Sequence, residues 1–454
     1  MVSDHFLAGR KTPVVLLVLT TFSTVFSGYT MIGVPDEAYE FGFPALKWAG
    51  TTISIAISFA IITPRLRTIS EYRNYSSPID FVTDRYHSES LRILILSALW
   101  VSDFIYLSGQ FSAISALVET VTEDQVPGYA GAIFMGVIIL LLESLGGLKS
   151  VMLTDAIQSC FMIFSFLVVP FLLNELFGDF SDLLESKDCE ETEFGSCGLN
   201  EQKDPYKQYP STLQTTAMAS SVFGFFSYSI LPQCIHRIYT SDSADSLRVT
   251  VTSIAYCPYF TMIPGIFMGL VCAARLNEDS DGTAFGIISG ELYDRGGFKK
   301  VVSCIMMCAG LAAISSTADS ALIAMSHLVS EDLYQKKFRP GATQTETVLI
   351  SKLCSLIVVV MAICMTLNDG FDVSRAAQIQ IGFQIQAWPA FFFGLFPEIL
   401  GFCPSSRSLV WGFVTSITVL IVVYTCVSAG VSFYFDPGTW GFVAYMLHIY
   451  IFEK

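Results

Sequence analysis

The feature that most constrains this chain is the recurrence of apolar runs along almost its whole length. Each run is about twenty residues long, which is enough to cross a bilayer as an α-helix. Most of these runs are apolar all round, whereas the helices of a soluble all-α protein show polar faces at a period of 3.6 residues. The sequence therefore predicts an all-α polytopic membrane protein embedded in the lipid bilayer.

Composition agrees with this prediction. Of the 454 residues, 52% are hydrophobic and only 14% are charged, whereas a soluble domain has about 25% charged residues. The net charge of −15 and the scattered basic residues give no indication of a nucleic-acid partner. We see no nucleophile–base–acid constellation, and His327 stands alone in its span, so we do not expect an enzyme.

The apolar runs predict eleven full spans and a partial one. The first run is too long for a cleavable signal peptide. The sequence stops in WGFVAYMLHIYIFEK, which resembles a span cut short, so we expect it to be incomplete at its ends. The predicted spans lie near 13–35, 45–63, 92–118, 127–147, 150–173, 213–235, 248–273, 301–329, 346–367, 376–398, 409–430 and 438–452.

Basic residues in the short loops orient the chain. If the spans alternate in direction, most of these loops fall on one side, which we assign to the cytoplasm of a plasma-membrane protein. The basic residues on that side are Arg10, Lys11, Arg65, Arg67, Arg73, Arg85, Arg92, Lys149, Arg237, Arg248, Lys336, Lys337 and Arg339.

The opposite side receives the acidic loop FGDFSDLLESKDCEETEFGSCGLNEQKDPY. Cys189 and Cys197 lie in this loop, and an oxidising exterior would allow a disulfide between them. The loop contains no His, which argues against a metal site.

Two spans have interrupted helical sequences. The first reads VVLLVLTTFSTVFSGYTMIGVP, and the sixth reads TTAMASSVFGFFSYSILPQC. Interrupted spans at matching positions of two halves indicate a transporter binding site, and an offset of five spans makes the second half inverted. The alternative is that Gly, Ser and Pro are simply common in membrane helices.

The stretch ISSTADSA in the eighth span places Ser316, Thr317, Asp319 and Ser320 close together on a predicted helix. Small residues and hydroxyls line packed membrane helices, so packing is one interpretation. A cation site is the other, because intramembrane carboxylates mark ion or proton pathways. Asp155 in the fifth span is a second such carboxylate. Asp103 and Glu143 are weaker candidates, which we interpret as structural or interfacial.

Several motifs, in order, give the chain a resemblance to the sodium:solute symporter family. They are DHFLAGR, SGYTMIGVPDEAYEFG, TISEYRNYSSPIDFVTDRY, GGLKSVMLTDAIQ, ILPQCIHRIYTSDSADSLR and ISSTADSALIAMSHLVSEDLY. The proline-symporter-like branch is the most similar. The resemblance implies one transmembrane domain over residues 1–454 with a leucine-transporter-type core. It implies a first repeat at 13–173, an extracellular acidic loop at 174–212, an inverted second repeat at 213–399 and extra C-terminal helices at 400–454.

The resemblance also implies Na⁺ as the coupling ion. The first Na⁺ site would use the hydroxyls of Ser316 and Thr317 and the carbonyls of Ala313, Ser23 and Phe26. A second site, for Na⁺ or a proton, would use Asp155, Asp319 and Ser320. The sequence departs from the family at Val25, where proline-type carriers have Asp, and at Asp319, where relatives have Ser or Thr.

For the solute, the resemblance points to aromatic residues in spans one, three and six, and the tenth span adds a group of glutamines. Buried amides at membrane depth need partners, so this group fits either a solute site or hydrogen bonds between helices. The residues are Tyr29, Tyr106, Tyr228, Gln378, Gln380 and Gln384.

We therefore expect a Na⁺-coupled symporter that imports a small organic solute by alternating access. The alternatives are a solute-sensing receptor with a transporter-like fold and an ion-permeable channel without uphill transport.

Overall fold

The computed structural model describes residues 8–177, 212–275, 282–367 and 373–453. Within these ranges no strand forms, and an isolated parallel bridge joins Thr12 to Ser241. Seven of the described helices are long and apolar enough to cross a membrane, and a bent helix pair makes an eighth. The all-α membrane fold predicted from the apolar runs is confirmed.

The first half of the chain supplies the helices of the first five expected spans. Its long helix α8 turns sharply at Gly147, where φ is 61°, and so contains two of these spans. The main elements are α2 (Val14–Val25), η2 (Tyr29–Gly33), α3 (Val34–Phe41), α5 (Ile53–Arg73), α7 (Glu89–Thr122) and α8 (Gly128–Phe177).

The second half repeats the pattern of a broken helix followed by long ones. The broken helix consists of α10 (Thr212–Phe225), η4 (Phe226–Ile230) and α11 (Pro232–Thr240). The elements that follow are α12 (Ala244–Arg275), α14 (Gly297–His327), η5 (Leu328–Phe338), α15 (Gln344–Thr366), α16 (Val373–Gln384) and α17 (Trp388–Leu395).

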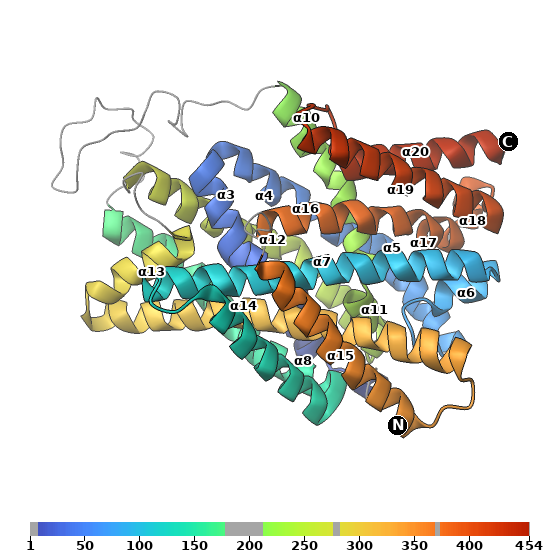
Figure 1. Ribbon diagram of the computed structural model, residues 1–454, viewed down its shortest axis with the longest axis horizontal. Helices are drawn as coiled ribbons and strands as arrows, with labels where there is room; N and C mark the ends of the chain where they lie inside the picture. Colours follow the sequence, from blue (N-terminus) through green and yellow to red (C-terminus); the bar gives the residue numbers. More distant parts are fainter. Residues whose placement is uncertain (1–7, 178–211, 276–281, 368–372, 454) are drawn as a thin grey trace.

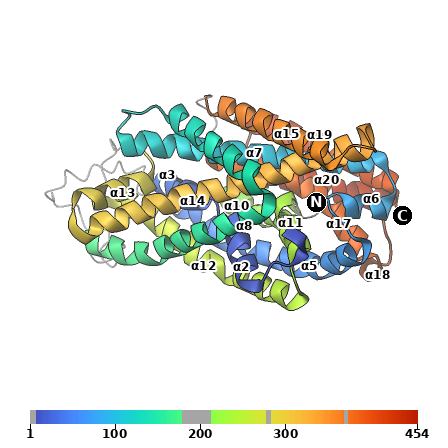
Figure 2. The same cartoon turned by 90° about the horizontal axis from the view of Figure 1, so that it is seen from below.

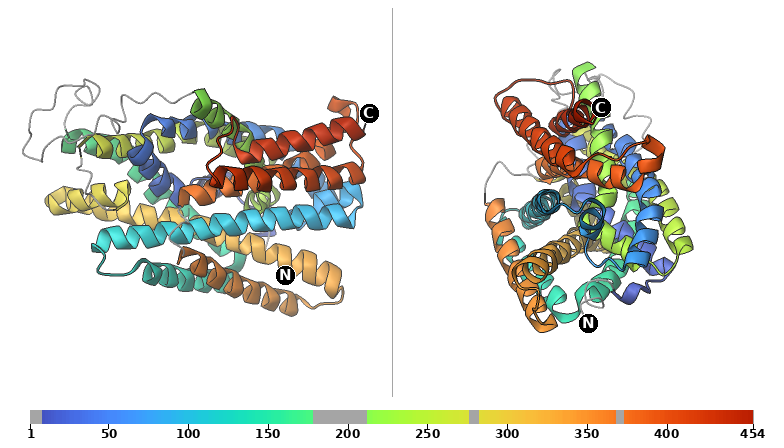
Figure 3. Two further views of the ribbon diagram at one scale, coloured as in Figure 1. Left: turned by 45° about the horizontal axis from the view of Figure 1, so that its top comes forward. Right: turned by 90° about the vertical axis from the view of Figure 1, so that its right-hand side faces the viewer.

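Two further helices, α19 (Ser406–Ser428) and α20 (Pro437–Phe452), pack against each other on one side of the molecule (Figure 3). Short elements connect the long ones. They are η1 (Ala8–Arg10), η3 (Phe43–Leu46), α4 (Lys47–Thr51), α6 (Asp80–Tyr86), α13 (Ala284–Asp294), η6 (Ile385–Ala387) and α18 (Pro397–Leu400). The connector α6 lies at the same end of the molecule as α18 (Figure 1).

Helix α14 lies at the centre of the bundle. It packs against α7, α8, α15 and α2, and every residue from Ala312 to His327 is buried. The small residues of this stretch allow neighbouring backbones to approach closely. Helix α2 also contacts α8 and α12 (Figure 2). The polar stretch of α14 is thus brought against the break that follows α2.

Candidate functional site

The first span is broken where its sequence reads FSGY. Phe26 is extended, with φ −99° and ψ 104°, and the helices on either side of the break are bent by 57°. Beyond the break, the Thr30 N–H donates to the Ser27 carbonyl at 2.9 Å. The regular helical ladder therefore ends at Phe26, which leaves main-chain oxygens at the break for other partners.

Gly28 lets the broken helix approach its neighbours closely. Its N–H donates to Oε1 of Gln110 on α7 at 3.0 Å. A Cβ atom at this position would lie 2.6 Å from a side-chain carbon of Ile314 and 2.8 Å from that same Oε1 atom. A larger residue at this point would displace the side chains of Ile314 and Gln110.

The structure brings together four of the five residues predicted for the first Na⁺ site. The Thr317 hydroxyl donates to the Ser23 carbonyl at 3.2 Å, and the Ser316 hydroxyl lies 3.3 Å from the same carbonyl. Ser316 also lies 3.3 Å from the Ala313 carbonyl. Phe26, the fifth residue, lies at the helix break three positions after Ser23. Hydroxyl and carbonyl oxygens are the ligands that a hard cation prefers.

At the predicted second site the structure places a side chain that the sequence analysis had assigned to a loop. Arg237 lies on α11 and is buried. Its Nη2 atom is 2.9 Å from Asp155 Oδ2, donates to the Ser320 hydroxyl at 2.6 Å and lies 3.3 Å from Thr20 Oγ1. Two of the three predicted ligands are therefore joined by a guanidinium. The sequence missed this contact because the residue follows the break of the sixth span.

Asp319 is the third residue of that set. It is fully buried, and neither of its carboxylate oxygens has a hydrogen-bond partner among the described residues. A buried charge without a partner is costly, so such a group calls for a cation or a proton. The residue that departs from the family pattern is thus a buried carboxyl group whose oxygens both lack a partner among the described residues.

The predicted solute residues of spans three, six and ten lie at the core. Tyr106, Tyr228, Gln380 and Gln384 are all buried. Gln378 is exposed instead and does not share their face. The physical reason is that two positions along an α-helix turn the side chain by about 200°, whereas four positions return it nearly to the same side.

Tyr29 lies apart from these residues. Its hydroxyl donates to Glu37 Oε2 at 2.9 Å, and the Trp48 indole N–H donates to the same oxygen at 2.6 Å. The Tyr29 and Trp48 rings meet edge to face, 4.9 Å apart. Phe225 continues the row from Trp48 to Tyr228, with ring centroids 5.5 Å and 5.2 Å apart. An aromatic row thus connects the two broken helices.

The model of the sodium:solute symporter family matches residues 5–398. The chain belongs to this family. The symporter is 25% identical to the sodium/proline symporter of Escherichia coli (strain K12) over 417 residues, which cover 87% of this chain and 76% of the relative. It is 24% identical to the osmoregulated proline transporter of Bacillus subtilis (strain 168), over 93% of this chain and 84% of the relative.

Solved structures confirm the leucine-transporter-type fold. A Na⁺-coupled sialic acid symporter in a substrate-bound outward-open state matches with a TM-score of 0.75 at 15% identity, covering 99% of this chain and 91% of that chain. The transporter MhsT in complex with L-phenylalanine matches with a TM-score of 0.59 at 12% identity, covering 96% and 97%. The symporter is therefore a multi-pass integral membrane protein and a Na⁺-coupled transporter. Its family consists of transporters, in agreement with the expectation of no enzymatic activity.

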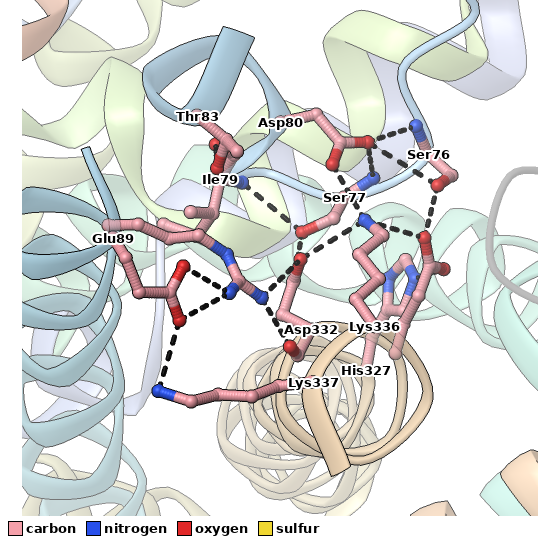
Figure 4. Close-up of polar contacts among 12 residues, drawn as sticks. Ser76, Ser77, Ile79, Asp80, Thr83, Glu89, His327, Asp332, Lys336 and Lys337 are labelled. Atoms are coloured by element: carbon pink, nitrogen blue, oxygen red, sulfur yellow. Dashed lines mark hydrogen bonds and ion pairs between the residues drawn. The ribbon is translucent and has the colours of Figure 1, made fainter. Parts of the chain in front are cut away.

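An ionic network joins several elements of the symporter on the side assigned to the cytoplasm (Figure 4). Lys336 on η5 lies 2.6 Å from Asp80, 3.0 Å from Glu331 and 3.1 Å from Asp332. Arg92 on α7 donates to the Asp332 carbonyl. The network therefore connects the loop and helix that follow α5 with the ends of α7 and α14.

Further hydrogen bonds strengthen this connection. Ser76 donates to Glu331 and Ser77 to Asp332. The nearby Tyr75 hydroxyl donates to Asp84 at 2.6 Å. Burial and the Asp84 carboxylate raise the pKa of Tyr75, which keeps it a neutral donor.

His327 is not alone, contrary to the interpretation from sequence. Its Nδ1 atom lies 2.8 Å from Nε2 of His236 on α11, and its Nε2 atom lies 2.5 Å from Glu331 Oε2. Two neutral rings satisfy both contacts if each Nε2–H donates. The ionic network is thereby linked to the helix that also carries Arg237.

The remaining site prediction is the disulfide between Cys189 and Cys197. Both residues lie outside the described residues.

Proposed function

We propose that this symporter resides in the plasma membrane and imports a small organic solute by alternating access, driven by Na⁺ bound at Ser316, Thr317, Ala313, Ser23 and Phe26. The observation that supports this proposal most is the convergence of the Ser316 and Thr317 hydroxyls on the Ser23 carbonyl beside a broken helix. Packing alone does not require two neighbouring hydroxyls to meet one main-chain oxygen at a helix break.

Coupling between ion and solute follows from the position of this site. An ion there would hold α14 against the break after α2, and that break begins the segment that reaches Gln110 on α7 through Gly28. Each Na⁺ that crosses a potential of 100 mV supplies about 2.3 kcal/mol, which corresponds to more than a tenfold gradient of solute. In this scheme the two halves, 13–173 and the inverted 213–399, move relative to each other around the site.

The solute site lies, in this proposal, among Tyr106, Tyr228, Gln380 and Gln384, with the aromatic row from Tyr29 on its outer side. The relatives named as proline symporters and transporters make L-proline the first solute to test. The ionic network around Lys336 closes the cytoplasmic side, and it must separate when the solute is released inward.

For the second ion we propose that Arg237 supplies the cation beside Asp155, and that Asp319 binds a second Na⁺ or a coupled proton. Asp319→Asn then lowers the Hill coefficient for Na⁺ in the first case and abolishes the pH dependence of uptake in the second. Uptake with unchanged ion dependence in this variant contradicts the role of Asp319.

The main test is uptake by the purified chain in proteoliposomes. Labelled L-proline and a panel of other labelled solutes are offered with and without an inward Na⁺ gradient. We expect accumulation of at least one solute above its external concentration only when the gradient is present. Accumulation without Na⁺, or Na⁺-driven currents without any solute uptake, would contradict the proposal, and the second result would favour a channel.

A further inference from the structure

Helix α7 presents a polar stripe to the core of the bundle. Asp103, Tyr106 and Gln110 follow one another at intervals of three and four residues, which places them on one face of the helix. All three are buried. Gln110 is engaged by the broken helix through the Gly28 N–H. The two residues before it on this face, Tyr106 and Asp103, therefore continue the stripe from the break into the bundle.

Asp103 lies among the residues proposed for the solute site. It lies one helical turn before Tyr106 on α7, and the Gln233 amide is its neighbour. The preceding residue on α7, Ser102, donates to the Gln380 carbonyl at 3.2 Å. Asp103 therefore lies on a helix that packs against α16, with Gln233 of α11 as its neighbour.

This carboxylate has no internal counter-charge among the described residues. Asp103 forms no ion pair there, and the group beside it is the neutral Gln233 amide, which does not make a well-formed hydrogen bond to either carboxylate oxygen. Arg237, the buried guanidinium on the neighbouring α11, is already held by Asp155 and by the Gln233 carbonyl. Removing a carboxylate from water without a partner is expensive, so a group of this kind is expected to meet a ligand.

Gln380 presents a further hydrogen-bond acceptor in this region. Gln384 Nε2 lies 2.6 Å from the Ser227 carbonyl, which can only accept, so Gln384 Oε1 must accept from Gln380 Nε2 at 2.7 Å. This chain of bonds leaves Gln380 Oε1 as an acceptor, and that atom is buried without a partner. The Gln233 amide adds one further acceptor, its oxygen, and one donor, its Nε2 group.

We infer that Asp103 binds the ammonium group of the transported solute, and that this solute is therefore a small organic cation or zwitterion whose nitrogen carries hydrogen atoms. Such a group supplies the positive charge that Asp103 lacks and the N–H donors that Asp103 and Gln380 Oε1 can accept. Tyr106 lies beside Thr317 and Ser27, so it connects this group to the first ion site. The inference rests on the proposed function.

The test measures binding rather than transport. The full chain, purified in nanodiscs with NaCl, is mixed with compounds of one ring size and different charge: L-proline, pyrrolidine and cyclopentanecarboxylate. The twenty amino acids, putrescine and glucose extend the set. We expect compounds with an N–H ammonium to raise the thermal unfolding temperature, and cyclopentanecarboxylate and glucose to leave it unchanged. Stabilisation only by neutral or anionic compounds, or by none of the ammonium compounds, overturns the inference.

Variants then test whether Asp103 is the residue that binds the ammonium group. Asp103→Asn should weaken binding of the best ammonium compound at least tenfold while the Na⁺ concentration that half-stabilises the protein changes less than twofold. Asp103→Glu keeps the charge and should retain the preference for ammonium compounds. Glu143→Gln is the matched control, because Glu143 is also a buried carboxylate but accepts from Ser326 and Ser355 at 3.1 and 2.7 Å. Unchanged affinity in Asp103→Asn overturns the inference.

Failure of the proposed function gives a different result. A chain that binds ammonium compounds through Asp103 but accumulates no solute under a Na⁺ gradient contradicts the transport proposal alone. A chain that accumulates a neutral or anionic solute under the gradient contradicts the role of Asp103 alone. If Asp103→Asn does not yield monodisperse protein, two results still test the inference. They are the set of compounds that stabilise the wild-type chain and the preference of Asp103→Glu for ammonium compounds.

Discussion

Ser316 and Thr317 are adjacent in sequence and would diverge by about 100° on an isolated helix. In the folded chain both hydroxyls still reach one carbonyl, that of Ser23. The reason is that the end of α2 lies directly against this part of α14, so that the oxygen falls between the two side chains. At the residue scale, the proposed ion site therefore depends on the contact between two helices.

Removing one of these hydroxyls should weaken Na⁺ binding more than it destabilises the fold. We expect Ser316→Ala to raise the half-saturating Na⁺ concentration for uptake at least tenfold, which is about 1.4 kcal/mol. Ser315→Ala is the control, since the Ser315 hydroxyl bonds to its own helix at Leu311 and to Gln158. Equal Na⁺ dependence of the two variants in proteoliposome uptake would contradict the assignment of the first site.

Removing one partner of the buried ion pair between Arg237 and Asp155 should destabilise the folded protein. Arg237→Gln leaves a buried carboxylate without its counter-charge, which costs about 3–5 kcal/mol when one partner of a buried pair is removed. We expect a clearly lower thermal unfolding temperature in nanodiscs. The double variant Arg237→Gln/Asp155→Asn should recover most of the lost unfolding temperature, because no buried charge then lacks its partner. Additive losses in the double variant would show that the two side chains do not interact.

At the scale of elements, the two helix breaks determine where polar groups can lie. The break after α2 ends the main-chain ladder at Phe26, and the second break, between η4 and α11, places Leu231 in an extended conformation with ψ 134°. The residues that follow this second break include Gln233, His236 and Arg237, which all point into the bundle and are buried. An unbroken sixth helix would not bring all three to these neighbours.

The close fit at Gly28 makes the first break sensitive to a single methyl group. Gly28→Ala adds a Cβ atom 2.6 Å from Ile314 and 2.8 Å from Gln110, so these two side chains must shift, and the Gln110 hydrogen bond to the residue 28 N–H is disturbed. Overpacking of this kind costs about 1–3 kcal/mol. We expect uptake to fall more than tenfold, with a lower unfolding temperature.

Gly50→Ala serves as the control for this change, since nothing lies within 4 Å of a Cβ atom built at that position. Its uptake and unfolding temperature should match those of the wild-type chain. If both variants behave alike, the close approach at Gly28 is not required for transport.

At the scale of the whole molecule, the ionic network holds together parts of the chain that are far apart in sequence. The loop after α5 contacts η5, because Ser76 donates to Glu331, which lies 255 positions further along the chain. The isolated bridge at Thr12 adds a main-chain contact between the segment before α2 and the end of α11. Opening this side requires several of these contacts to break together, which is the behaviour expected of an inner gate.

Neighbouring lysines offer a matched test of this gate. Lys336 pairs with three carboxylates, including the buried Asp332, whereas Lys337 pairs with the exposed Glu89 at 3.0 Å. Their side chains are similarly accessible, at 34% and 37%. We expect Lys336→Met to raise hydrogen–deuterium exchange at least tenfold in peptides covering 76–86 and 328–338, and Lys337→Met to leave it nearly unchanged. Similar exchange in both variants would contradict a gating role.

The sequence by itself determined the class of the molecule. Apolar runs of bilayer length fixed the all-α membrane fold, because a backbone in lipid must satisfy its own hydrogen bonds. Local order in ISSTADSA and FSGY was enough to indicate an ion site and a helix break, since both depend on neighbouring residues. Gln378 was misplaced because its spacing from Gln380 was not converted into an angle around the helix.

Tertiary structure alone decided which polar side chains meet. The pairing of Arg237 with Asp155, and of His236 with His327, joins residues 82 and 91 positions apart. Asp103 shows the same limit: in the sequence it is one carboxylate in a span, and only the tertiary structure reveals that no described basic side chain pairs with it. Charge compensation depends on distances in space, which one chain sequence does not contain.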